Sequence, residues 1–171
     1  MNDINKEKII IIDFGSQVTK LIARRVREIG VFSEVLTLNQ LKKIRSFKKI
    51  KGLILSGGPA TVTKKLFPKI PMHIFSKNIP ILGICYGLQL IAKSFGGKVK
   101  SGNKKREFGR AILKKNKNSL LTKNFFKKNK TKVWMSHQDI VCKIPKGFNK
   151  IASTKDSALT IIENKKKKLF G

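Results

Sequence analysis

The stretch Lys-Ile-Ile-Ile-Ile-Asp at residues 8–13 indicates the fold class. A continuous β-branched run that ends at a carboxylate is typical of a strand buried on both faces of a parallel sheet. Apolar residues then recur at helical spacing, so we expect a helix over residues 17–29 whose apolar stripe faces the core. This stripe consists of Val18, Leu21, Ile22, Val26 and Ile29.

Strand and helix signals continue to alternate as far as residue 97. Apolar runs predict strands at residues 33–38, 52–56 and 79–84. Helices are expected at residues 39–44, 66–77 and 86–95. Asn39 is the expected N-cap of the first of these helices, and Pro68 and Pro71 interrupt the second. This alternation predicts a doubly wound, mostly parallel α/β sheet flanked by helices.

The second half of the chain has a different character. Short strands are expected at residues 110–113, 132–135, 139–142, 150–152 and 159–163. Turn-rich or lysine-rich segments separate them, which predicts a smaller antiparallel strand layer in this half. The four lysines at residues 165–168 are expected at a solvated hairpin tip or a frayed end. Residues 1–171 suffice for a single domain with one core, and a second domain is not expected.

The net charge of +30 raises the question of a polyanionic partner. The positive charge comes from 33 Lys and only 6 Arg, with one Trp and one Tyr in the chain. Specific nucleic-acid binding relies on arginine forks and stacking aromatic rings, which are scarce here. We therefore expect salt-sensitive, nonspecific attraction and no specific nucleic-acid partner, with a basic nucleic-acid protein as an alternative from another class.

The sequence contains no apolar run of about 18 residues and no signal peptide, so no membrane span is expected. Two cysteines, Cys85 and Cys142, do not form a disulfide scaffold, and no His or Cys cluster suggests a metal site. A soluble cytoplasmic protein is the expectation.

The segment Gly83-Ile84-Cys85-Tyr86-Gly87 follows the nucleophile-elbow pattern with Cys in the place of Ser. A tight turn between strand and helix lifts the Cys85 thiol above the carboxyl edge of the sheet, where open α/β folds bind ligands. The N-terminus of the following helix would favour the thiolate. Cys142, within a short apolar strand, is interpreted as a structural residue.

A thiolate that attacks a carbonyl needs hydrogen-bond donors for the developing oxyanion and a base. The Ser-Gly-Gly-Pro turn at residues 56–59 offers the N–H of Gly58, and the elbow offers that of Tyr86. Gln89 follows one helical turn after Cys85 and points back toward it in the expected helix. Of the two histidines, His73 is assigned no role, and His137 is a candidate base.

Five segments, taken in order, resemble class I glutamine amidotransferases. They lie at residues 12–17, 56–59, 83–89, 107–111 and 133–137. Asp-Phe-Gly-Ser-Gln at residues 13–17 and Trp-Met-Ser-His at residues 134–137 are similar to the glutaminase domains of GMP synthases in particular. The resemblance extends over about residues 8–171.

This resemblance implies that Cys85 attacks the side-chain amide of L-glutamine and forms a γ-glutamyl thioester. Gly58 and Tyr86 match the oxyanion-hole positions, and Gln89 matches a residue that positions the substrate. Ser136 and His137 match the segment that contacts the amino-acid end of glutamine, so His137 is then a substrate-side residue and not the base. No cofactor is expected in this domain.

The resemblance also implies a partner. Ammonia would pass to an ATP-pyrophosphatase (synthetase) domain, which aminates XMP to GMP with ATP and magnesium, in an enzyme expected to be a homodimer. The family's base His and its orienting Glu have no matching residues, because no His follows His137. The domain is therefore expected to be incomplete at its C-terminal end and inactive alone. Two alternatives are a subunit of an anthranilate- or aminodeoxychorismate-type synthase and a non-catalytic glutamine-binding or partner-binding subunit.

Overall fold

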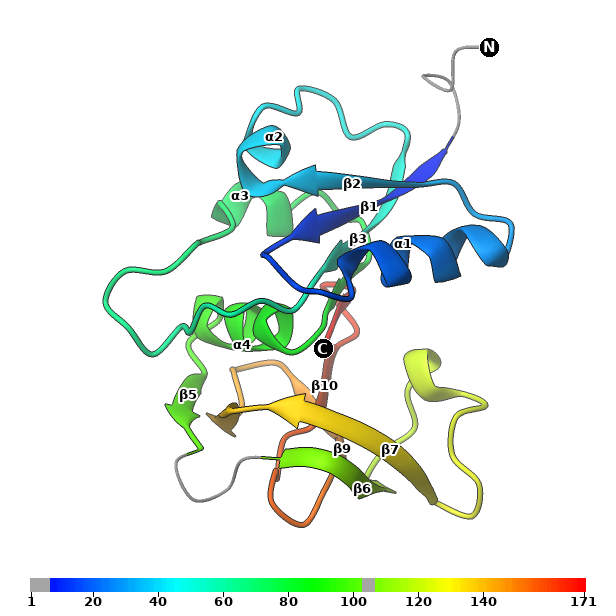
Figure 1. The fold of residues 1–171 in the computed structure, drawn as a ribbon, viewed down its shortest axis with the longest axis vertical. Helices are drawn as coiled ribbons and strands as arrows, with labels where there is room; N and C mark the ends of the chain where they lie inside the picture. The colour runs from blue at the N-terminus through cyan, green and yellow to red at the C-terminus, as the bar shows by residue number, and fades with distance from the viewer. Residues whose placement is uncertain (1–6, 103–106) are drawn as a thin grey trace.

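The computed structural model describes residues 7–102 and 107–171 (Figure 1). The strands are β1 (Lys8–Asp13), β2 (Ser33–Thr37), β3 (Ile50–Leu55), β4 (Ile81–Gly83), β5 (Lys98–Ser101), β6 (Glu107–Lys115), β7 (Lys130–His137), β8 (Asp139–Lys143), β9 (Asn149–Ser153), β10 (Ile161–Asn164) and β11 (Leu169–Phe170). The helices are α1 (Thr19–Glu28), α2 (Leu38–Lys42), α3 (Met72–Phe75), α4 (Tyr86–Ser94) and the 3-10 turn η2 (Leu120–Thr122).

The central sheet has the strand order β2-β1-β3-β4-β11-β10-β9-β6-β7. Its first five strands are parallel, and β1 lies between β2 and β3 as its buried apolar run predicts. Ile10 and Ile12 pack into the main core cluster, whereas Ile11 is buried outside it, because alternate side chains of a strand point to opposite faces. The carboxyl ends of β1, β3 and β4 therefore lie at one edge of the sheet.

The remaining strands of the central sheet are antiparallel and continue the parallel half. Strands β6 and β7 form a long hairpin in which Glu107 pairs with His137 and Lys114 with Lys130. Strands β5 and β8 form a separate two-stranded sheet. The predicted fold class is confirmed, although most of the antiparallel strands extend the main sheet and do not form a layer of their own.

Two short strands were not expected from the sequence. Strand β5 carries lysines at alternate positions and is largely exposed, so it has no apolar pattern. Strand β11 has only two residues, yet it joins the parallel and antiparallel halves by pairing with β4 and β10. The lysines at residues 165–168 form the turn before β11, as the hairpin-tip interpretation predicts.

The predicted orientation of α1 is only partly right. Ile22 and Val26 of the expected stripe are half-buried, but the buried residues are Thr19 and Ala23, and Val18, Leu21 and Ile29 are exposed. Two hydrogen bonds set this orientation. Thr19 Oγ1 donates to Asp13 Oδ1 at 2.8 Å, and Ser33 Oγ donates to the carbonyl of Ala23 at 2.9 Å. These bonds tie the small-residue side of α1 to the sheet.

The N-cap prediction for the second helix is also wrong, because α2 begins at Leu38 with Thr37 as its cap. Thr37 and Gln40 form a reciprocal capping box, which satisfies two donors that Asn39 could not reach from inside the helix. The helix expected at residues 66–77 shortens to α3, which begins directly after Pro71.

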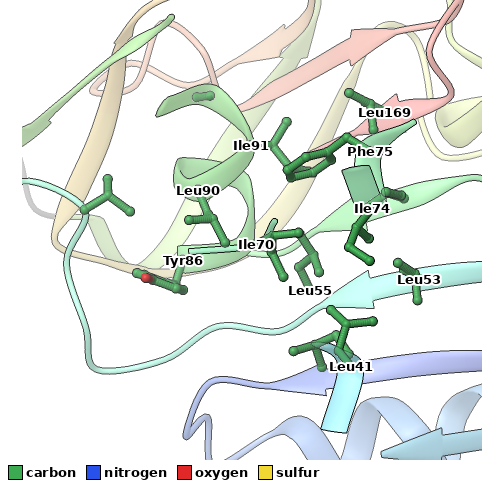
Figure 2. Packing of buried hydrophobic residues seen from close by; sticks show 14 of the residues in the cluster. Leu41, Leu53, Leu55, Ile70, Ile74, Phe75, Tyr86, Leu90, Ile91 and Leu169 are labelled. Atoms are coloured by element: carbon green, nitrogen blue, oxygen red, sulfur yellow. The ribbon is translucent and has the colours of Figure 1, made fainter. Parts of the chain in front are cut away.

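The main core lies between the sheet and helices α2, α3 and α4. Figure 2 shows Leu41 from α2, Ile74 and Phe75 from α3, and Leu90 and Ile91 from α4 gathered around the strands. Tyr86 joins this cluster at the first turn of α4, and its ring meets Phe14 edge-on at 5.1 Å between centroids. Packing around Tyr86 therefore fixes the helix that follows Cys85.

Replacing Leu90 tests the contribution of this core. Leu90 is 0% exposed, so we expect Leu90→Ala to lower the free energy of unfolding by about 2–5 kcal/mol, through lost burial and a cavity. Leu66, which is 88% exposed, provides the matched control, and Leu66→Ala should change that free energy by less than about 0.5 kcal/mol. Urea unfolding measures both, and equal losses would contradict the assigned core.

Candidate active site

Cys85 occupies the sharp turn between β4 and α4. Its backbone has φ +50° and ψ −106°, a conformation that residues other than glycine rarely adopt. Such strain persists only where the surrounding structure enforces it, and it is concentrated at functional sites. The turn lifts the Cys85 side chain to the carboxyl edge of the sheet, where it is exposed.

One glycine on each side of Cys85, Gly83 and Gly87, allows this turn. A Cβ at Gly83 would lie 2.4 Å from the carbonyl carbon of Gly87, and a Cβ at Gly87 would lie 2.2 Å from the carbonyl oxygen of Leu55. The amide of Gly87 donates to the carbonyls of Ser56 and Ile84 at 3.2 and 2.9 Å. The first turn of α4 therefore packs directly on the backbone at the end of β3.

The thiol of Cys85 faces the end of β7, where its Sγ lies 3.9 Å from the carbonyl oxygen of Ser136. Burial raises the pKa of the Cys85 thiol above its ordinary value. Part of the side chain is exposed, yet the protein around the sulfur removes enough water to penalise the thiolate. Desolvation thus opposes the effect on the thiolate that is expected from the N-terminus of α4.

The six residues that the sequence predicts to form the site all line one polar cleft of about 530 Å³. They are Gly58, Cys85, Tyr86, Gln89, Ser136 and His137. They come from the turn after β3, the first turns of α4 and the end of β7, so the fold brings together segments that lie far apart in the sequence. The volume falls within the range of about 300–1,000 Å³ that is typical of small-molecule sites.

Gly58 and Tyr86 line the cleft together with the thiol. A Cβ at Gly58 would lie 2.3 Å from the carbonyl oxygen of Phe14, so the turn after β3 packs closely on the end of β1. The N–H of Tyr86 belongs to the first helical turn, whose amides have no acceptor within the helix. The side chain of Tyr86 has a different task, because its hydroxyl donates to the carbonyl of Pro68 at 2.8 Å. Burial raises the pKa of Tyr86 to about 12.

Gln89, Ser136 and His137 line the same cleft. Gln89 is buried, and its Nε2 donates to the carbonyl of Asp139 at 3.1 Å, which ties α4 to the turn between β7 and β8. The Nε2 of His137 lies 3.0 Å from Oε2 of the buried Glu107. Their roles toward a substrate stay predictions.

Sequence reasoning missed Asp139, which also lines the cleft and accepts a hydrogen bond from Thr61 Oγ1. Asp139 lies two residues after the segment 133–137, which was a signal of its place near the site, but a lone carboxylate after a strand indicates no chemistry. His73, on α3, and Cys142, on β8, do not line the cleft. Cys142 instead donates to the carbonyl of Lys98 at 3.4 Å.

The raised pKa makes a testable difference to the reactivity of Cys85. Only the thiolate attacks an alkylating reagent, so in a Cys142→Ser background the rate with iodoacetamide should rise about tenfold per pH unit near neutrality. It should still be rising above about pH 8.5, the ordinary thiol pKa. Mass spectrometry of quenched samples measures the rate. A plateau below about pH 8 would contradict the direction of the shift.

Among the residues that the structure describes, no helix is long and apolar enough to cross a membrane. In the same part of the chain, no three His, Cys, Asp or Glu side chains gather in a way that could hold a metal ion.

Comparison with known proteins places this geometry in a family. The profile of the class-I glutamine amidotransferases matches residues 10–171. A GMP synthase [glutamine-hydrolyzing] of Brachyspira hyodysenteriae is 46% identical over 167 residues, which are 97% of this chain and 32% of the relative. That of Prochlorococcus marinus is 48% identical over 95% of this chain and 30% of the relative. The chain thus spans about a third of the length of these curated relatives.

Solved structures agree on the fold. A GMP synthase subunit from Thermoplasma acidophilum has a TM-score of 0.79 and 26% identity, over 97% of this chain and 82% of that one. A glutamine amidotransferase of Thermotoga maritima has a TM-score of 0.76 at 19% identity, over 98% of this chain and 75% of that one. With the cysteine elbow and its cleft in place, the chain belongs to the class-I glutamine amidotransferase family.

Proposed function

We propose that this chain is the glutaminase domain of a GMP synthase, which releases ammonia from L-glutamine for the amination of XMP to GMP. The observation that carries the proposal is the position of the Cys85 thiol on a strained elbow inside a cleft that also contains Gly58, Tyr86 and Gln89. The relatives that match nearly all of the chain are named glutamine-hydrolysing GMP synthases, and they favour this acceptor over that of another synthase.

The reaction begins when the sulfur of Cys85 attacks the side-chain amide carbon of glutamine. A C–S bond forms, and the carbonyl oxygen becomes an oxyanion that accepts hydrogen bonds from the N–H groups of Gly58 and Tyr86. Collapse of this intermediate breaks the C–N bond, and the nitrogen takes up a proton and leaves as ammonia. Water then attacks the thioester and releases glutamate together with the free thiol.

The amino-acid end of glutamine has matching charges in the cleft. Among the described residues that line it, Asp139 is the only carboxylate and Lys64 the only lysine. Asp139 suits the α-ammonium group, and Lys64 suits the α-carboxylate. The Ser136–His137 segment then contacts the same amino-acid end, and Gln89 positions the bound glutamine, as the resemblance implies.

The proton transfers need a base. His73 lies outside the cleft, and the resemblance assigns His137 to the substrate side, so neither histidine is given this role. The raised pKa of Cys85 adds to this need, because the thiol holds its proton more tightly than an ordinary cysteine does. We therefore expect ammonia release by the 171-residue chain alone to be slow.

The partner in this proposal is an ATP-pyrophosphatase (synthetase) domain, which contributes the ATP and magnesium chemistry. The relatives are about three times the length of the match, which leaves room for such a domain in them. We further propose that the whole enzyme is a cytoplasmic homodimer and that its glutaminase domain holds no cofactor.

Covalent labelling tests the assignment of Cys85. The chloroketone analogue of glutamine, in which a chloromethyl ketone replaces the side-chain amide, should alkylate Cys85 and leave Cys142 free. Excess glutamine should protect Cys85, whereas asparagine, one methylene shorter, should not. Mass spectrometry locates the adduct, and Cys142→Ala serves as the control that keeps full labelling. Equal labelling of both cysteines, or no protection by glutamine, would overturn the proposed function.

Turnover tests the expectation of a missing base. Ammonia release from glutamine by the 171-residue chain should be slow, and it should rise when a synthetase domain is added with XMP, ATP and magnesium. Rapid release by the chain alone, abolished by Cys85→Ala, would show that the base lies among its own residues. Glutamine binding by calorimetry without ammonia release, even with the synthetase domain present, would instead support a non-catalytic binding subunit.

A further inference from the structure

The buried carboxylate of Glu107 has no part in the reaction as described above. Glu107 is 7% exposed, begins β6 and is the cross-strand neighbour of His137. Removing a carboxylate from water is costly unless partners compensate for the lost hydration. A carboxylate buried at this cost beside the cleft indicates a task for the partners that its two oxygens contact.

The two oxygens of Glu107 connect two separate elements. Oε1 accepts a hydrogen bond from Thr154 Oγ1, in the turn between β9 and β10. Oε2 lies 3.0 Å from His137 Nε2, which is within ion-pair distance but without the geometry of a hydrogen bond. Thr154 is itself held in place, because its Oγ1 accepts from the amide of Ser157 and its amide donates to the carbonyl of Ser157, both at 2.9 Å. The carboxylate thus joins a rigid turn to the end of β7.

The end of β7 contacts the nucleophile directly. The carbonyl of Ser136, one residue before His137, lies 3.9 Å from Cys85 Sγ. The Nδ1 of His137 is buried and has no hydrogen-bond partner among the described residues, so only the contact through Nε2 orients the ring. A shift of the His137 ring would therefore move the adjoining Ser136 backbone relative to the thiol.

We propose that Glu107 is a positioning residue that acts through His137. Oriented by Thr154, it holds the Ser136–His137 segment at the distance from Cys85 that a bound glutamine requires. Glu107 itself touches neither substrate nor thiol. This inference rests on the proposed function, since it specifies which residues set the glutamine site.

Glu163 provides a matched control. It is 5% exposed, lies on β10 of the same sheet and accepts a hydrogen bond from the hydroxyl of Ser119. Its chemistry, burial and hydroxyl partner therefore match those of Glu107. Neither carboxylate lines the cleft that contains Cys85, but Glu107 contacts His137, which does line it, whereas the partner of Glu163 is Ser119, which does not.

The test compares two reagents on the 171-residue chain. The chloroketone analogue of glutamine requires the Ser136–His137 segment, whereas iodoacetamide reacts with the thiol without it. Because a misplacement of about 1 Å can cost on the order of 100-fold, Glu107→Ala should slow the chloroketone at least about tenfold. It should change the iodoacetamide rate less than about twofold. Glu107→Gln, which keeps the shape and can still accept from Thr154, should restore most of the chloroketone rate.

Urea unfolding shows whether Glu107→Ala folds. If it does not, Thr154→Val, which is nearly isosteric, repeats the test. This variant should slow the reaction with the chloroketone and leave that with iodoacetamide unchanged. Glu163→Ala should leave the ratio of the two rates unchanged. The positioning role would be overturned if the Glu107 or Thr154 variants slowed both reagents equally or slowed neither. It would also be overturned if Glu163→Ala showed the same selective loss of the chloroketone rate. A wild-type chain that shows no preference for the chloroketone would instead overturn the proposed function itself.

Discussion

The contact on which the site depends is the close approach of the first turn of α4 to the end of β3. The Cα of Gly87 sits so near Leu55 that a Cβ there would lie 2.2 Å from the carbonyl oxygen. The amide of Gly87 bonds to Ser56 in the same contact. Because helix and strand meet backbone to backbone, the chain between them must turn sharply, and Cys85 takes up the left-handed conformation that results.

The rest of the cleft follows from this contact. The turn after β3 brings Gly58 beside the thiol, and the packing of Tyr86 against Phe14 keeps the first turn of α4 in the core. Gln89 then extends from the second turn of α4 to the carbonyl of Asp139, which attaches the β7–β8 turn to the same helix. The parallel half of the sheet thus supplies the nucleophile, and the antiparallel half supplies the facing wall.

This basic chain contains few carboxylates, and most of their contacts in the described part of the fold are with hydroxyl groups or with single cations. It has 9 Asp and Glu against 39 Lys and Arg, and exposed ion pairs such as that between Arg24 and Glu28 contribute little to stability. Four carboxylates instead accept hydrogen bonds from Ser or Thr hydroxyls. The pairs are Asp13 with Thr19, Glu107 with Thr154, Asp139 with Thr61 and Glu163 with Ser119. Three of these four pairs join segments that lie far apart in the sequence, and none of the four involves a lysine.

Local patterns in the sequence were enough to predict the parallel half, the elbow and the membership of Cys85, Gly58 and Gln89 in one site. Those patterns are a β-branched run, glycines around a cysteine and helical spacing. The orientation of α1, the pairing of β11, the raised pKa of Cys85 and the link from Thr154 through Glu107 to His137 emerge only in the folded chain. Each of these arises from contacts between segments distant in the sequence, where burial and partner geometry outweigh local preference.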